Sequence, residues 1–212
     1  MGLIRRSFNE LKRDKFCFLY AGGVPNMKEY DIEGLVGLSL TRHDKKHIKH
    51  DITNKFPIED GIVDVFQAED VFEHIEYEKL AEVMDEIYRV LKSGGYFRLS
   101  VPDYRFDVYR NRSLFNSNGE LAFDPDGGGS FKNGHVCDGG HVWFPVYESV
   151  LELVKNSKFT NYEFLHYTDS DGNSVTKEID YSKGYIQRTP DNDPRGTNPY
   201  RVISIVADMY KE

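Results

Sequence analysis

The residues best suited to acid–base chemistry stand in and beside a long loop near the middle of the chain. Residues 124–140 are rich in glycine and aspartate, and this stretch with the residue after it contains His135, Asp138 and His141. An imidazole can take a proton near neutral pH while a carboxylate orients it, which would assist a reaction in which a hydroxyl loses its proton. The glycines would let the loop close over a substrate and exclude water.

A second group of polar residues has the spacing of metal ligands or of helix caps. Asp70, Glu73 and His74 stand at positions i, i+3 and i+4, which the start of a helix would place on one face. Their carboxylate oxygens suit Mg²⁺, which needs few protein carboxylates. We favour the other explanation, in which Glu73 and His74 cap and orient the helix. A divalent metal at these residues is kept as a secondary hypothesis.

Two further motifs could hold a cofactor. Ala21-Gly22-Gly23 follows the apolar residues 16–20, and the missing Cβ atoms would let a cofactor approach the backbone. Glycines also mark turns after strands in many folds. Asp51 follows a third short strand, where it could equally accept a hydrogen bond from a ligand or cap a turn. Neither motif alone is specific.

The apolar pattern predicts the elements that would position these residues. Short apolar runs predict strands at residues 16–20, 35–38, 47–50, 62–66 and 96–101. Helical spacing predicts helices at residues 3–13, 77–91 and 146–154, with Ser93-Gly94-Gly95 ending the second. The alternation indicates an α/β fold with a Rossmann-like, doubly wound, mostly parallel sheet and helices on both faces.

The C-terminal part departs from this alternation. Residues 160–167 and 201–210 predict two long strands joined by a polar loop without a helix, which favours an antiparallel hairpin at one edge of the sheet. No repeat or long linker divides the 212 residues, so we expect one domain. Its parts would be an N-terminal helix (1–14), a cofactor-binding core (15–103), a substrate loop or lid (104–145) and a C-terminal helix with edge strands (146–212).

Composition argues against several classes of partner. The formal charge is −8, and lysine and arginine are scattered along the chain, so we expect no nucleic-acid partner. No apolar run approaches the roughly 20 residues that span a bilayer, so we expect no membrane partner. Cys17 and Cys137 lack metal-type spacing, which favours free thiols in a reducing compartment and a cytoplasmic location.

The order of the motifs is far more specific than any one of them. The glycine turn and Asp51 are followed by Phe56-Pro57-Ile58-Glu59-Asp60-Gly61-Ile62-Val63-Asp64-Val65, then Glu73-His74, then Arg89-Val90-Leu91-Lys92-Ser93-Gly94-Gly95. Over residues 15–105 the chain thereby resembles the class I methyltransferases that depend on S-adenosylmethionine (SAM), in particular their type 11 branch. The resemblance implies the class I methyltransferase fold, SAM as the cofactor and transfer of its methyl group.

The resemblance also implies roles for individual residues. Ala21, Gly22 and Gly23 would lie under the methionine part and the ribose of SAM. Asp51 would accept a hydrogen bond from the adenine amine, beside Ile52. The sulfonium side would be lined by residues from the end of the fourth strand, which are Gln67, Ala68 and Glu69.

Ribose binding is where the chain departs from the family pattern. The usual first turn has a G-x-G-x-G character, whereas Val24-Pro25 follows the glycine pair here. Ser39 stands at the cofactor-binding position where an acidic residue would grip the ribose hydroxyls. Glu33 or Asp44 would substitute for it, or the ribose would be held more weakly.

For catalysis, the resemblance favours His141 as the base that takes the acceptor's proton. Related enzymes often have a histidine shortly before an aromatic pair, which here is Trp143-Phe144. Asp103, just beyond the fifth strand, or Asp138 would orient its ring. Some family members hold a divalent cation with an E-x-x-E-H motif, and this chain offers the same spacing with aspartate in the first place.

The acceptor is predicted only by analogy. The short segment between the glycine turn and the second strand resembles methyltransferases found beside or fused to glycosyltransferases, in bacterial surface-glycan pathways and in large DNA viruses. We therefore expect O-methylation of a sugar hydroxyl, for example on a terminal deoxysugar, and a place within a larger glycosyltransferase-containing protein. The alternatives are methylation of a small acid, amine or phenol, and an inactive methyltransferase fold that only binds. An NAD-dependent oxidoreductase is disfavoured, because the G-x-G-x-x-G fingerprint is missing.

Overall fold

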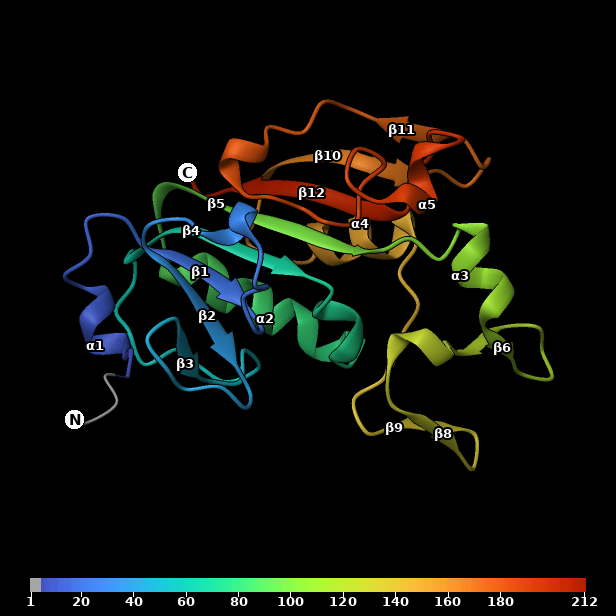
Figure 1. Cartoon of the computed structure of the whole chain (residues 1–212), viewed down its shortest axis with the longest axis horizontal. Coiled ribbons are helices and arrows are strands. Elements are labelled where there is room, and N and C mark those ends of the chain that lie inside the picture. The colour runs from blue at the N-terminus through green and yellow to red at the C-terminus, as the bar shows by residue number, and fades with distance from the viewer. Residues whose placement is uncertain (1–4) are drawn as a thin grey trace.

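The computed structural model describes residues 5–212 and has one eight-stranded sheet at its centre (Figure 1). The strand order is β11-β10-β12-β5-β4-β1-β2-β3. The strands are β1 (Phe18–Ala21), β2 (Leu35–Ser39), β3 (His47–Lys49), β4 (Val63–Glu69), β5 (Leu91–Pro102), β10 (Asn161–Thr168), β11 (Ser174–Thr176) and β12 (Ser204–Tyr210). β1 to β5 are parallel, and the order reverses between β1 and β4. This confirms the predicted Rossmann-like, doubly wound sheet.

The C-terminal strands confirm the antiparallel pairing and correct its details. β12 lies between β5 and β10 and runs antiparallel to both, while β11 takes the edge. The segment between β10 and β12 contains β11, the 3-10 helix η4 (Tyr181–Lys183) and the helix α5 (Pro194–Thr197). The expectation of a loop without a helix there is therefore wrong. Helices of three or four residues are too short to show a periodic apolar pattern.

Two amphipathic helices cover one face of the sheet. They are α2 (Tyr77–Val90) and α4 (Tyr147–Lys155), both close to their predicted bounds. Their apolar sides, including Leu80 and Ile87 of α2 and Val150 of α4, join inward-facing strand residues in the main core. The driving force is the removal of this apolar surface from water.

The end of α2 differs from the prediction. The helix ends at Val90 and β5 begins directly at Leu91, so Ser93-Gly94-Gly95 lies inside the strand instead of ending the helix. Gly94 has φ +79°. The register between β5 and β4 shifts at this point, between Val63 and Val65 of β4. A strand irregularity of this kind needs a residue that tolerates positive φ, which explains the glycines.

The opposite face of the sheet is covered by short helices and extended chain. The 3-10 helix η1 (Lys28–Tyr30) and residues 177–203 lie over it, and Tyr30 packs near Tyr185. Arg98 of β5 is fully buried here, paired with Asp208 of β12. Its remaining N–H groups donate to backbone carbonyls of residues 180 and 184, which ties this segment to the sheet.

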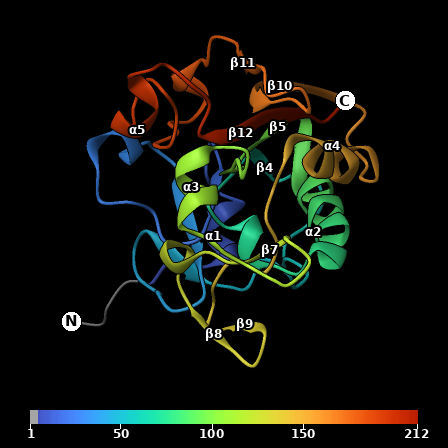
Figure 2. The same ribbon diagram turned by 90° about the vertical axis from the view of Figure 1, so that its right-hand side faces the viewer.

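Residues 104–145 form a separate layer beyond the carboxyl ends of β4 and β5 (Figure 1). They contain helix α3 (Asp107–Arg112), the hairpin of β6 (Leu114–Phe115) and β7 (Leu121–Phe123), the 3-10 helix η3 (Pro125–Gly127), and the hairpin of β8 (Ser130–Lys132) and β9 (His135–Cys137). Figures 1 and 2 both show β8 and β9 projecting away from the sheet. The stretch predicted as a loop at 124–140 is therefore partly regular. Asn133-Gly134, both with positive φ, makes its hairpin turn.

The N-terminal helix is shorter than predicted. Helix α1 spans Phe8–Leu11, and the predicted contributions of Leu3 and Ile4 lie outside the described residues.

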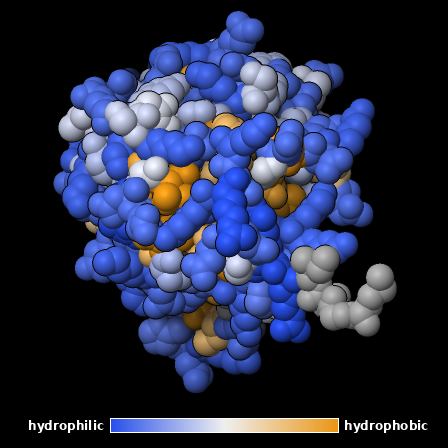
Figure 3. All heavy atoms as spheres, turned by 90° about the vertical axis from the view of Figure 1, so that its left-hand side faces the viewer, coloured by the Kyte–Doolittle hydropathy of each residue, from blue (hydrophilic) through white to orange (hydrophobic). Residues whose placement is uncertain are grey.

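Within residues 5–212, no helix combines the length and apolar character needed to cross a membrane. The face on the side of α1 and β3 is mainly hydrophilic, with hydrophobic atoms in a few small areas (Figure 3).

Candidate cofactor and acid–base site

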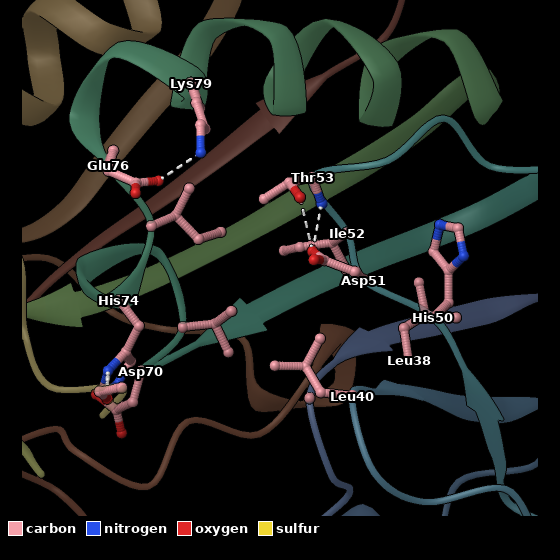
Figure 4. A pocket seen from close by; sticks show the side chains of 14 residues that line it. Leu38, Leu40, His50, Asp51, Ile52, Thr53, Asp70, His74, Glu76 and Lys79 are labelled. Atoms are coloured by element: carbon pink, nitrogen blue, oxygen red, sulfur yellow. Dashed lines mark hydrogen bonds and ion pairs between the residues drawn. The ribbon is translucent and has the colours of Figure 1, made fainter. Parts of the chain in front are cut away.

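A cavity of about 500 Å³ opens at the carboxyl ends of the parallel strands (Figure 4). It lies where the strand order reverses, which is the place where open α/β sheets bind ligands. Its volume falls within the roughly 300–1,000 Å³ of small-molecule sites. Its walls come from the ends of β1 to β4, from the start of α2 and, through Gly139, from the layer of residues 104–145.

One end of the cavity combines a bare backbone with apolar side chains and a carboxylate. Gly22 has φ +92°, a conformation that glycine adopts without strain. Leu40 and Ile52 supply apolar walls. Oδ1 of Asp51 accepts the N–H (3.0 Å) and hydroxyl (2.8 Å) of Thr53, so Oδ2 is available to a ligand. Of the predicted cofactor residues, Gly22, Asp51 and Ile52 therefore line the cavity.

The other predicted residues of the first two strands do not line it. Ala21 is buried beneath the cavity, and Gly23 is exposed outside it. Ser39 is also buried, and its Oγ accepts the backbone N–H groups of residues 41 and 42. Of its suggested substitutes, Glu33 precedes β2 at the far end of the strand, and Asp44 bonds Nδ1 of His47. An anionic partner for a ribose does not come from these positions.

The residues predicted from the end of β4 are also away from the cavity. Ala68 is buried in the main core, while Gln67 and Glu69 face the opposite side of the sheet, because side chains alternate along a strand. Gln67 donates to the carbonyl of Tyr185 (2.7 Å). Glu69 accepts the N–H of Gln187 and two tyrosine hydroxyls, and burial raises its pKa to about 7.

His141, the predicted base, lies buried against His74, which lines the other end of the cavity, and belongs to a chain of hydrogen bonds. Its Nδ1 is 2.5 Å from the hydroxyl of Tyr104, which lies 2.7 Å from Oδ2 of Asp124. A carboxylate accepts more strongly than an imidazole, so the tyrosine hydroxyl donates to Asp124 and Nδ1–H of His141 donates to the tyrosine oxygen. Nε2 is then unprotonated and faces Oε1 of Glu73 at 3.7 Å.

Burial lowers the pKa of His141 to about 3, and the proximity of His74 and of two arginines adds to this shift. The ring is therefore neutral at physiological pH, with a lone pair on Nε2. Such a weakly basic nitrogen is a poor proton acceptor by itself. Its role as the base stays a prediction.

The expected partners of His141 are elsewhere. Asp103 is buried and accepts the backbone N–H groups of Arg105 and Thr168, both at 2.9 Å. Asp138 is exposed and accepts from Ser130. The prediction that Asp103 or Asp138 orients His141 is wrong, because their hydrogen bonds go to other groups. His135 is exposed on β9, apart from the buried set.

Glu73 and His74 lie beside His141, on the 3-10 helix η2 (Phe72–His74). One ligand atom from each of Glu73, His74 and His141 lies within 4.8 Å of the others. Both carboxylate oxygens of Glu73 are buried and, within residues 5–212, have no hydrogen-bond partner. Burial and the charge of Asp70 raise the pKa of Glu73. Asp70 itself pairs with Arg188 at 2.9 Å.

Sequence reasoning missed Tyr104, Asp124 and Arg188, which surround this cluster. Tyr104 and Asp124 were within segments singled out for the acceptor, but their pairing depends on how residues 104–145 fold back. Arg188 comes from the segment covering the other face of the sheet. No local spacing in the sequence relates these three residues.

The fold and part of the sequence match known methyltransferases. Residues 31–99 match a family model described as a methyltransferase domain. A SAM-dependent methyltransferase from Methanosarcina mazei is 11% identical, with 97% of each chain covered and a TM-score of 0.52. A possible histamine N-methyltransferase from Thermotoga maritima is 13% identical, with 96% of this chain and 86% of that chain covered and a TM-score of 0.53. No curated protein matches the chain.

A third structure holds ligands. It is the 1,6-didemethyltoxoflavin-N1-methyltransferase from Burkholderia thailandensis with its substrate and S-adenosylhomocysteine. It is 10% identical, with 92% of this chain and 71% of that chain covered and a TM-score of 0.50. This chain has the class I methyltransferase fold. Together with the domain match over residues 31–99, the fold supports SAM as the cofactor of a SAM-dependent methyltransferase.

The cavity fits that cofactor. Oδ2 of Asp51 can accept from an adenine amine, and Leu40 and Ile52 can contact the base. The backbone at Gly22 has no side chain to obstruct a bound nucleoside. The sulfonium end would then point toward Asp70 and His74, which lie together at one end of the cavity in Figure 4, instead of toward the predicted Gln67 and Glu69.

Proposed function

We propose that the chain transfers the methyl group of SAM to a hydroxyl oxygen of a sugar in a glycan. The proposal rests on the position of the cluster of Glu73, His74 and His141, because His74 belongs both to this cluster and to the cavity wall. Buried groups that can withdraw a proton therefore stand beside the place for the cofactor. A hydroxyl acceptor needs such groups, since it must lose its proton as the methyl group is transferred.

The reaction is a displacement at carbon. The acceptor oxygen bonds to the methyl carbon, the carbon–sulfur bond breaks, and the products are a methyl ether, S-adenosylhomocysteine and a proton. Much of the acceleration in such a step comes from holding the two reactants in line. Two hydrogen bonds fix the layer of residues 104–145 beside the cavity. The Gly139 carbonyl accepts from Nδ1 of His74 (2.8 Å), and the N–H of Val142 donates to the Glu73 carbonyl (2.9 Å). These bonds hold the layer against the cavity and help to exclude water.

A sugar suits the polar end of this cavity. Carboxylate and imidazole groups there can hydrogen-bond several hydroxyls of a polyhydroxylated acceptor. The position methylated, and attachment to a glycosyltransferase, follow only by analogy and belong to the same proposal. Cys17 and Cys137 are unpaired thiols, which supports action in a reducing compartment such as the cytoplasm.

A small-molecule amine is the second candidate acceptor. Two proteins of known structure with the same fold are described as N-methyltransferases, one of them as a possible one. An amine that reacts in its neutral form already carries a lone pair, so no buried base is needed before the methyl group is transferred. The cluster of Glu73, His74 and His141 favours the hydroxyl.

A mass-spectrometric screen tests the choice of acceptor. The protein is incubated with SAM and matched panels of glycosides, amines, phenols and carboxylic acids. The methylated products and S-adenosylhomocysteine are each quantified in the same samples. We expect methyl ethers from one or more glycosides, in equal amount to the S-adenosylhomocysteine formed. Turnover of amines, phenols or acids alone would contradict the proposal. Calorimetry with SAM serves as the control, because absence of cofactor binding would indicate a scaffold.

A further inference from the structure

We propose that Glu73, His74 and His141 bind a divalent first-row transition-metal ion. Glu73 supplies the first observation. It is completely buried, and neither of its carboxylate oxygens has a hydrogen-bond donor among the described residues. A buried carboxylate is costly unless a cation or donors compensate it. The cluster lies within 4.8 Å, so one ion can contact a ligand atom of all three residues.

The hydrogen bonds of both imidazoles leave a nitrogen free for a metal. Nδ1 of His74 faces the Gly139 carbonyl at 2.8 Å, and a carbonyl can only accept, so this nitrogen carries the proton. Nδ1 of His141 donates to Tyr104 by the argument given above. In the neutral tautomer that these bonds select, Nε2 is the nitrogen of each ring that is free to bind a metal. Fixing the tautomer through the distal nitrogen is the usual arrangement around metal-bound histidines, and here Tyr104 and Asp124 provide it.

A proton shared between Glu73 and His141 does not account for the arrangement. The distance from Oε1 to Nε2 is 3.7 Å, which is longer than a hydrogen bond. The unprotonated Nε2 and a carboxylate oxygen therefore face each other without a donor between them. A cation between the two removes this mismatch, since both atoms are electron-pair donors.

The ligand set indicates which ions fit. Two imidazole nitrogens and one carboxylate oxygen suit ions such as Mn²⁺, Co²⁺ or Zn²⁺, whereas Mg²⁺ prefers oxygen ligands. Three protein ligands leave coordination positions for water or an acceptor, and His74 places the site at the cavity. An ion there would make an acceptor hydroxyl more acidic. This role rests on the proposed function, whereas the binding site does not.

Metal binding is measured directly, with MnCl₂ as the probe. The protein of 212 residues is stripped with a chelator, and bound Mn²⁺ is counted by electron paramagnetic resonance, with ZnCl₂ as competitor. We expect one Mn²⁺ per chain, displaced by Zn²⁺. Glu73→Gln, His74→Gln and His141→Asn should each weaken binding at least about 100-fold. His43→Gln, which changes an exposed histidine outside the cavity, is the matched control and should bind as the wild type does.

Thermal unfolding gives a second readout that does not require activity. Metal at about 100 times its Kd should raise the Tm of the wild type by roughly 5–10 °C. Without metal, Glu73→Gln should have a Tm equal to or above the wild type, because it replaces a buried carboxyl group that has no hydrogen-bond partner by a neutral amide of similar shape. It should gain nothing from metal. Tyr104→Phe should keep the site but weaken binding roughly 10–100-fold, because it removes the acceptor for Nδ1 of His141.

The outcomes separate this inference from the proposed function. The metal site would be overturned if the wild type bound neither Mn²⁺ nor Zn²⁺ at millimolar concentration. It would also be overturned if all three ligand variants bound the metal as tightly as the wild type does. If the chelated protein still methylates glycosides at the full rate, the role of the ion in turnover is overturned while the proposed function stands. One bound ion with no methylation of any glycoside would instead support the site and contradict the sugar acceptor.

Discussion

The two ends of the cavity are built in different ways. At the cofactor end, Gly22 follows β1, and Asp51 and Ile52 follow β3. The two strands flank β2 and end at the same edge of the sheet, so the path of the backbone alone brings these residues together. At the acid–base end, Glu73 and His141 come from segments far apart in the chain. They meet because residues 104–145 fold back against η2.

Because of this difference, substitutions should affect the two ends in different ways. The cofactor end relies on backbone shape and one half-buried carboxylate. The acid–base end relies on buried polar groups whose protonation depends on one another, from Glu73 through His141 and Tyr104 to Asp124. In such a network, removal of one group leaves the neighbouring buried group without its hydrogen-bond partner. We therefore expect substitutions at the acid–base end to affect turnover and those at the cofactor end to affect SAM affinity.

The largest effect is expected for His141→Ala. Loss of the imidazole should lower kcat by about 10²–10⁴-fold, because the buried set of Glu73, His74 and His141 that receives the hydroxyl proton loses one member. The affinity for SAM, measured by calorimetry, should change by no more than about twofold, because His141 is not on the cofactor side. Turnover close to that of the wild type would indicate an acceptor that has already lost its proton, such as a carboxylic acid.

Glu69 is a buried carboxylate outside the cavity, and its protonation should affect stability alone. Burial raises the pKa of Glu69 from 4.5 to about 7, so the folded state binds its proton more tightly than the unfolded state. Stability from this group is present below about pH 4.5 and declines as the pH rises through 7, by up to about 3 kcal/mol. Glu69→Gln should therefore lose less stability than the wild type between pH 4.5 and 7.5. Urea unfolding at the two pH values measures this, and equal losses would contradict it.

Asp51→Ala tests the cofactor end directly. Removing a charged acceptor for the adenine amine should weaken SAM binding by roughly 10–100-fold, with kcat at saturating SAM close to that of the wild type. Calorimetry provides the measurement. Asp60→Asn is a matched control, because Asp60 is exposed, pairs with Arg89 and lies outside the cavity. If both variants bind SAM equally well, the adenine lies elsewhere.

The smallest effect is expected at two glycines with positive φ. Gly22→Ala and Gly94→Ala should each cost about 1–2 kcal/mol, which corresponds to roughly 2–8 °C in Tm, because both place a side chain in the left-handed region. Only Gly22→Ala should also weaken SAM binding, since Gly22 lines the cavity and Gly94 does not. Equal SAM affinity in the two variants would show that the backbone at Gly22 is not approached by the cofactor.

Much of the fold could be predicted from the sequence. The parallel strands and α2 follow from short apolar runs and from the spacing of Leu80, Val83 and Ile87, which are local signals. The start of β5 was predicted wrongly. Ser93-Gly94-Gly95 lies inside this strand and does not end the preceding helix, and glycines occur both at helix ends and at strand irregularities. In the site, Gly22 and Asp51 were found because each directly follows a strand. Gln67 and Glu69 were misplaced, because the sequence does not tell which face of a buried strand borders a ligand.

The doubly wound sheet, the cofactor end of the cavity and the candidacy of Glu73, His74 and His141 can be read from the amino-acid sequence. The three-dimensional arrangement is needed to see that these three residues meet, that Tyr104 and Asp124 orient His141, and that Asp103 and Asp138 do not. The two kinds of feature differ in the range of the interactions that produce them. Strand ends and helix faces follow from the repeat of the backbone over a few residues, whereas the protonation and pairing of buried polar groups depend on whichever distant segment covers them.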